Sequence, residues 1–323
     1  MKTTLFNARI SWLATLIALL FCWPTAPLCM GQSSGEGAGQ NPMVNPSSLP
    51  APTSLSAPSA TSQIKSYGQI TVPEIFPGIL EGYLQREDLP NSLALVPPAP
   101  TPGTAAYELD EAVSQAELTL LGSQRWDLAK IDADLTFPQV AGTFSCSLGV
   151  PVSEADTPHV YMLLRRSLTD AGLSTYSAKD HYKRSRPFVA NKQSTCTPQQ
   201  EARLIKDGSY PSGHATVGWA WALILTEIAP ERADAVLARG RAFGESRLIC
   251  NAHWQSDVSE GRVVGAGTVA RLHADASFRA DLDAAKTEYA VAFAKGLKPS
   301  RDCAAEASAL AIRPTADAKP TVH

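Results

Sequence analysis

The chain has 323 residues, with 28 basic against 31 acidic side chains, and hydrophobic residues make up 44% of it. This charge balance and apolar content exclude a basic nucleic-acid binder, a collagen-like repeat and a wholly unfolded chain. The apolar residues are concentrated after about residue 70, and nothing between residues 100 and 295 is typical of an interdomain linker. We therefore predict one large domain with a substantial core.

The first 31 residues have the pattern of a secretory signal. Lys2 and Arg9 form a short basic end, and an apolar run follows from Ile10 to Phe21. A run this short does not span a bilayer, and the basic-then-apolar order is typical of a cleaved signal peptide. We expect cleavage after Gly31 and a periplasmic or secreted product without stable membrane insertion.

Composition divides the rest of the chain into four parts. Residues 32–66 are rich in Pro, Ser, Gly and Ala, which predicts a disordered spacer. Residues 67–103 contain recurrent prolines in a partly apolar stretch, so we expect an extended arm that lies on the domain or on a partner subunit. The helical domain is expected at residues 104–300, and a C-terminal tail at 301–323.

Helical periodicity dominates after residue 103. Helices are expected at about 106–121, 213–228 and 231–245, from Ser256 to His273, and along a last face formed by Phe278, Leu282, Ala285, Tyr289 and Phe293. Ser153 followed by Asp156 resembles a capping box for another helix, which Gly172 would end. Since no alternating strand of useful length is present, the predicted fold class is all-α, a helical bundle.

Four cysteines remain once the signal is removed: Cys146, Cys196, Cys250 and Cys303. An even number in an oxidising compartment predicts two disulfides, with three connectivities left open. No two cysteines form a CxxC pair, and the six histidines are scattered. We therefore expect no metal site.

Three clusters carry groups typical of phosphoryl chemistry. They are Lys179 and Arg186 in KDHYKRSRP, Ser212, Gly213 and His214 in GSYPSGH, and Arg247, His253 and Asp257 in SRLICNAHWQSD. Each cluster alone has an ordinary explanation: solvated cations, a helix-capping turn, or a helix-surface ion pair. Together they supply what phosphoryl transfer needs, namely donors for the phosphoryl oxygens, a nucleophile and an acid.

His253 and Asp257 are the predicted nucleophile and its partner. If their segment is helical, residues four apart lie on one face, and the carboxylate accepts the N–H of one imidazole nitrogen. That contact fixes the tautomer and leaves the lone pair of the other nitrogen free to attack.

The second cluster predicts an anion site with an acid beside it. Ser212 and Gly213 precede an apolar helix, whose free backbone N–H groups bind anions. Ser212 adds a hydroxyl donor, and Gly213 lets an anion approach the backbone closely. His214, which is expected to titrate near neutrality, is the candidate general acid.

Basic side chains complete the predicted oxyanion site. Lys179, Arg186 and Arg247 are expected to stabilise negative charge on the phosphoryl oxygens, because arginine offers a fork of donors and lysine a compact charge. Lys183 and Arg184 lack this spacing and are interpreted as solvated.

The pattern K-x6-RP, PSGH and SR-x5-H-x3-D resembles the signature of the phosphatidic-acid phosphatase type 2 superfamily, which vanadium haloperoxidases share. From about Tyr83 to Gly265 the chain resembles the class A bacterial non-specific acid phosphatases, notably in DAGLSTYSAKDHYKRSRPF, DGSYPSGHATVGWAWALIL and SRLICNAHWQSDV. The resemblance implies an all-α bundle and a phosphomonoesterase that needs no metal or other cofactor, acts on small-molecule phosphate monoesters and forms dimers or larger homo-oligomers.

The resemblance also implies a role for each signature residue. His253 would attack phosphorus, Asp257 would orient it, His214 would protonate the leaving oxygen, and Lys179, Arg186, Ser212, Gly213 and Arg247 would hold the phosphoryl group. Water would then release phosphate from the phosphohistidine, and an alcohol in place of water would give phosphate transfer.

Three alternatives use the same residues. A vanadium-dependent haloperoxidase would bind vanadate in this pocket, and a nucleoside di- or triphosphate diphosphohydrolase would differ in pocket shape. A non-catalytic phosphate-binding protein would need the anion donors alone, so the presence of both His253 and His214 argues against it.

Overall fold

The computed structural model describes residues 72–314. The expected signal peptide and spacer, and residues 315–323, lie outside this range. Within it the all-α prediction is confirmed: helices account for nearly all regular structure, and the strands form one two-stranded antiparallel hairpin of β1 (Glu74–Phe76) and β2 (Ile79–Leu80).

In chain order, the helices are α1 (Ser92–Leu95), α2 (Ala105–Glu117), α3 (Gln124–Asp132), α4 (Ser145–Leu148), α5 (Pro158–Leu173), α6 (Tyr176–Tyr182), α7 (Pro187–Asn191), α8 (Glu201–Leu204), α9 (Gly213–Ile228), α10 (Ala233–Ile249), α11 (Gln255–Leu272), α12 (Ala276–Ala294) and α13 (Cys303–Ala311). Short 3-10 helices lie at Arg86–Asp88, Leu118–Leu120, Gln139–Phe144, Pro198–Gln200 and Pro230–Arg232.

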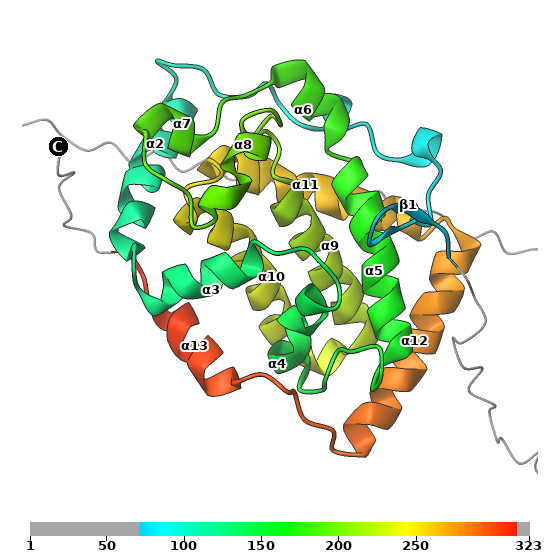
Figure 1. Cartoon of the computed structure of the whole chain (residues 1–323). Helices are drawn as coiled ribbons and strands as arrows, with labels where there is room; N and C mark the ends of the chain where they lie inside the picture. Colours follow the sequence, from blue (N-terminus) through cyan, green and yellow to red (C-terminus); the bar gives the residue numbers. More distant parts are fainter. Residues whose placement is uncertain (1–71, 315–323) are drawn as a thin grey trace, which may run out of the picture. The chain divides into compact units, whose positions relative to one another are not determined.

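Helix α9 is the central element of the described residues. It packs against α5, α10, α11 and α12, which surround it (Figure 1). Most of its apolar side chains are buried, Trp221 completely. Glycines let α11 approach closely, because a Cβ at Gly261 would lie 2.6 Å from the carbonyl oxygen of Ser212 and one at Gly265 2.6 Å from that of Thr216. This packing fixes the N-terminal ends of α9 and α11 against each other.

The expected helix boundaries are close to those observed, with two informative differences. The helix expected from Ser153 begins instead at Pro158, because the hydroxyl of Ser153 donates to Asp156 and accepts from its N–H within a separate turn. On α12, Phe293 is 51% exposed and Ala292 is buried in its place, so the apolar stripe ends earlier than expected.

Both ends of the described range carry more structure than their composition indicates. The arm residues form the hairpin and α1, and Asp170 of α5 accepts hydrogen bonds from the backbone N–H groups of Tyr83 and Leu84. Residues of the expected tail form α13, whose Glu306 pairs with Arg239 of α10.

The two expected disulfides are present, and the structure selects one of the three open connectivities. Cys146 is bonded to Cys303, and Cys196 to Cys250. The first joins α4 to α13, and the second joins the segment after α7 to the end of α10. Among residues 72–314, no helix is long and apolar enough to cross a membrane.

Candidate active site

A cavity of about 460 Å³ opens beside the N-terminus of α9. Its walls include five of the eight predicted site residues: Lys179, Arg186, Gly213, His214 and His253. The other three, Ser212, Arg247 and Asp257, are fully buried and do not line it. The structure thus gathers residues from three distant sequence clusters around one pocket.

The PSGH segment forms the entry of α9. Ser212 is the N-cap, and its hydroxyl accepts from the N–H of Ala215 at 3.3 Å. The Ser212 N–H donates to the backbone oxygen of Asp257 at 2.9 Å, which ties this turn to α11. A Cβ at Gly213 would meet nothing within 4 Å, so the cavity reaches the backbone there.

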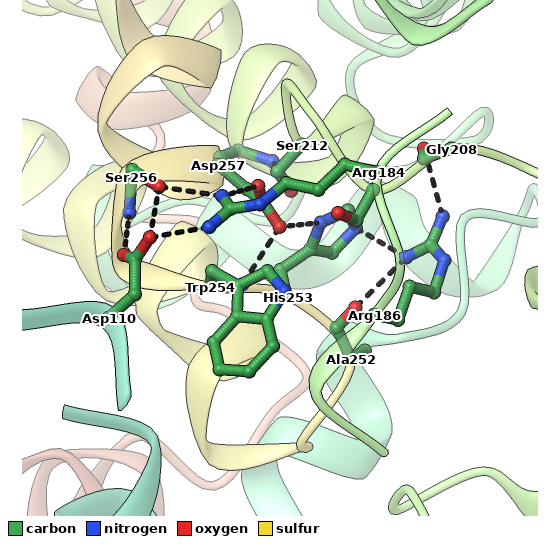
Figure 2. Close-up of polar contacts among 12 residues, drawn as sticks. Asp110, Arg184, Arg186, Gly208, Ser212, Ala252, His253, Trp254, Ser256 and Asp257 are labelled. Atoms are coloured by element: carbon green, nitrogen blue, oxygen red, sulfur yellow. Dashed lines mark hydrogen bonds and ion pairs between the residues drawn. The ribbon is translucent and has the colours of Figure 1, made fainter. Parts of the chain in front are cut away.

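His253 and Asp257 meet as expected, but not on one helix face. His253 precedes α11, and Asp257 lies in its first turn, where its Oδ2 accepts the Trp254 N–H at 2.8 Å. This capping contact turns the carboxylate toward His253, and Nδ1 of the ring lies 3.3 Å from the same Oδ2 (Figure 2). The pair therefore arises from helix capping rather than from helical spacing.

The partners of the His253 ring assign its tautomer. Nη1 of Arg186 lies 2.9 Å from Nε2 of His253, and a guanidinium can only donate. Nε2 is therefore the acceptor with the lone pair, and Nδ1 carries the proton toward Asp257. In this structure Arg186 occupies the lone pair of Nε2.

Burial lowers the pKa of His253 well below its ordinary value, and Arg186, Lys179 and Arg247 lower it further. This shift favours the neutral form of the ring. Burial likewise raises the pKa of Asp257, and the charge of Arg184 opposes that rise.

His214 differs from the expectation of titration near neutrality. Burial lowers its pKa well below 6.5, and Arg247 adds to the effect. Its Nε2 lies 3.0 Å from the carbonyl oxygen of Ala133, so Nε2 carries the proton and Nδ1 is the nitrogen left for exchange. The sequence could not show this, because neither Ala133 nor the burial is visible in the PSGH motif.

Asp207 is a site residue that the sequence analysis missed. Its Oδ2 lies 3.1 Å from Nη2 of Arg186 and 3.5 Å from Nζ of Lys179. Lys179 also donates to the carbonyl oxygen of Gly208. Burial lowers the pKa of Lys179 to about 8, and Asp207 opposes that fall. This carboxylate holds two of the cations that are expected to bind phosphate.

Arg247 has donors to spare. Nη1 contacts Sγ of Cys250 at 3.6 Å, while Nε and Nη2 have no hydrogen-bond partner among residues 72–314. The side chain is completely buried, and burial lowers its pKa to about 9. Buried donors without partners are costly, so an anion beside them would be strongly favoured.

Arg184 corrects the sequence analysis, which interpreted it as solvated. Its side chain is 9% exposed and makes two ion pairs of 2.6 Å, one with Asp257 and one with Asp110 of α2. Asp110 stands 74 residues away in sequence. No local spacing rule could connect them.

The acidic and histidine side chains provide no metal centre in the described part of the chain. Among residues 72–314, no group of three or more His, Cys, Asp or Glu side chains is placed to hold a metal ion. The pocket wall is largely apolar and carries the cations Lys179, Arg186 and Arg203, with Asp134 and Asp207 among its other residues.

The geometry fits a tetrahedral oxyanion bound beside the imidazole of His253. The family model of the PAP2 superfamily matches residues 160–280, which span Lys179 to Asp257. The chain is 44% identical over 209 residues to a non-specific acid phosphatase of Providencia stuartii, covering 64% of this chain and 84% of that protein.

Two further relatives agree. A non-specific acid phosphatase of Salmonella typhimurium is 43% identical over 62% of this chain and 81% of its own length. An acid phosphatase of Zymomonas mobilis is 42% identical over 61% and 74%. The chain belongs to the non-specific acid phosphatases of the PAP2 superfamily, which confirms the resemblance drawn from its motifs.

Proposed function

We propose that this acid phosphatase hydrolyses small-molecule phosphate monoesters through a covalent phosphohistidine on His253. The observation that carries the proposal is the His253 ring, whose Nε2 lone pair faces Arg186 in the cavity while Nδ1 faces Asp257. A nucleophilic imidazole needs one nitrogen that donates its proton to a carboxylate, here Nδ1, and one unprotonated nitrogen, here Nε2.

In the first step, Nε2 of His253 attacks phosphorus and the P–O bond to the leaving group breaks. Lys179, Arg186 and Arg247, with the Ser212 hydroxyl and the Gly213 N–H, stabilise the charge on the phosphoryl oxygens. Burial and then the charge of Arg247 depress the pKa of His214. The bound dianion opposes the effect of the nearby cations, so this ring can take up a proton and give it to the leaving oxygen.

In the second step, water attacks phosphorus and the P–N bond breaks. His214, now neutral, accepts the proton of the water. Phosphate leaves and His253 returns to its starting form. An alcohol that replaced water would receive the phosphoryl group, so we include phosphotransfer as a side reaction.

We propose a periplasmic or secreted location and a homo-oligomer of two or more chains. Two disulfides fit an oxidising compartment. N-terminal sequencing of the exported protein and its mass in solution by light scattering test these two points. A retained residue 1–31 segment, or a monomer at all concentrations, would contradict them.

The activity is tested by phosphate release from aryl, alkyl, sugar and nucleoside monophosphates between pH 4 and 9, with chelator present. Monoester hydrolysis that survives chelator and is inhibited by vanadate is the expected result. A nucleoside triphosphate and a bromide oxidation assay with vanadate are run in parallel. Preference for the triphosphate, or halide oxidation without phosphate release, would refute the proposed function.

A further inference from the structure

Behind His253 lies a buried chain of charges that the proposed mechanism does not use. It runs from Asp257 through Arg184 to Asp110 (Figure 2). The side chains of Asp257, Asp110 and Arg184 are 0%, 1% and 9% exposed. Neither Asp110 nor Arg184 touches the His253 ring in any contact found among residues 72–314, so any effect on it must pass through Asp257.

Both terminal nitrogens of the Arg184 guanidinium donate hydrogen bonds. Nη1 donates to Oδ1 of Asp257 at 2.6 Å and to the hydroxyl of Ser256 at 2.7 Å. Nη2 donates to Oδ2 of Asp110 at 2.6 Å. A planar fork with fixed donors holds two carboxylates in one geometry, which lysine could not do.

Asp110 anchors the other side of this fork. Besides Arg184, it accepts from the Ser256 N–H at 2.7 Å and from the Ser256 hydroxyl at 2.6 Å. Ser256 lies in the first turn of α11, directly before Asp257. Asp110 therefore joins α2 to the turn that carries the carboxylate and holds Arg184 in place at the same time.

The two oxygens of the Asp257 carboxylate contact different partners. Oδ1 faces Arg184, while Oδ2 faces the ring of His253 and the Trp254 N–H. A buried carboxylate without a cation would tend to take up a proton and lose its hold on Nδ1–H.

We propose that Arg184, held by Asp110, is a positioning residue for the proposed nucleophile: it fixes the Asp257 carboxylate in its ionised form, and Asp257 in turn orients His253. This inference rests on the proposed function and adds two residues to it. Neither Arg184 nor Asp110 is given a contact with the substrate.

The charges around the pair define what should change. His253 faces Arg186, and Lys179 and Arg247 also act on it, while Asp257 faces Arg184. Removing the positive charge at position 184 leaves the first three cations in place. It should raise the pKa of the Asp257 carboxyl and that of the His253 ring together, because both would feel less positive charge.

The test is Arg184→Gln, measured through the pH profile. Hydrolysis needs neutral His253 and ionised Asp257, so the acid limb of kcat/KM should move to higher pH, by about half a unit to one unit. We expect kcat to fall between about tenfold and a hundredfold, as for a small misplacement of a reacting group, with little change in KM.

Two further variants separate charge from packing. Arg184→Lys keeps the charge but not the fork, so its acid limb should stay near that of the wild type although kcat falls. Asp110→Asn removes a negative charge beyond Arg184, so its limb should move slightly to lower pH. The matched control is Arg166→Gln, which removes a part-buried arginine paired with Asp281, away from the pocket.

A second readout does not depend on turnover. The 15N shifts of the His253 imidazole, assigned with His253→Ala, report its protonation in each folded variant, and Arg184→Gln should raise the pKa that they give. If the limb and the imidazole titration stay in place while only the melting temperature falls, as for Arg166→Gln, the proposal is overturned. Absence of monoester hydrolysis in the wild type would instead refute the proposed function.

Discussion

At the scale of single residues, the negative charge of Asp207 partly balances the positive charges of Lys179 and Arg186 in the pocket. This carboxylate is 27% exposed, pairs with Lys179 and Arg186, and lines both the substrate cavity and a second hollow that shares these two cations. Its negative charge supports the proton on Lys179, whose pKa burial lowers to about 8. Asp207 thus keeps the lysine charged while lowering the net charge that a substrate meets.

As the pH is raised, anion binding by Asp207→Asn should weaken at a lower pH than anion binding by the wild type. Without the carboxylate, the pKa of Lys179 falls below its value of about 8, so the lysine loses its proton sooner as pH rises. The inhibition constant of vanadate, measured from pH 5 to 9, should begin to weaken roughly half a unit or more earlier than in the wild type. Coincident curves, or a shift to higher pH, would show that Asp207 does not support the Lys179 charge.

At the scale of elements, the hairpin supplies part of the cavity wall. Ile75, Phe76 and Ile79 line the pocket together with apolar residues of α5. Phe76 is 65% exposed, so it offers a ring face to a bound molecule without being part of the core. We therefore expect the hairpin to contact the leaving group rather than the phosphoryl group.

Phe76→Ser should lower kcat/KM for aryl monoesters more than for glycerol phosphate. Loss of one aromatic contact costs about 0.5–1.5 kcal/mol, or roughly twofold to twelvefold. The control is Phe293→Ser, at an exposed phenylalanine of α12 outside the cavity. It should leave kcat/KM unchanged for both substrates. Equal losses on both substrates would argue against contact between Phe76 and the leaving group.

The sequence predicted the elements better than their contacts. Helix α9 occupies the expected range 213–228 because its apolar periodicity and its Ser212 cap agree. Helix α5 begins later than expected, since the hydrogen bonds of Ser153 and Asp156 close a turn of their own and Pro158 sets the first helical position.

The motifs indicated the candidate site residues, but they did not indicate the burial or the interaction partners of these residues. The partners of Arg184 and Asp207 are brought close by the fold, as Asp110 shows at a separation of 74 residues from Arg184. The low pKa of His214 depends on burial and on Arg247, which a local pattern does not reveal. Long-range burial and charge therefore limit what sequence reasoning can assign.

At the scale of the whole molecule, the two disulfides should differ in what they protect. Cys196–Cys250 closes a separation of 54 residues and lies next to Arg247 through the contact of Nη1 with Sγ of Cys250. Cys146–Cys303 closes a separation of 157 residues and holds α13. Only the first is directly connected to the phosphoryl site.

Removing either disulfide should cost about 2–5 kcal/mol of unfolding free energy. The double variant Cys196→Ser with Cys250→Ser should also weaken vanadate inhibition under conditions where it remains folded, because Arg247 loses a neighbour that positions it. Cys146→Ser with Cys303→Ser should keep wild-type inhibition. Melting curves and inhibition constants check both, and equal vanadate affinity in the two variants would contradict the distinction.

The most direct test of the account is to trap the phosphoenzyme. An aryl phosphate labelled with 32P, quenched within milliseconds at alkaline pH, should leave label on the wild-type chain that is stable in base and lost in acid, as for phosphorus bound to nitrogen. Peptide mapping should place it on His253, and folded His253→Ala should carry none. Label on another residue, or turnover by His253→Ala near the wild-type rate, would contradict the phosphohistidine mechanism.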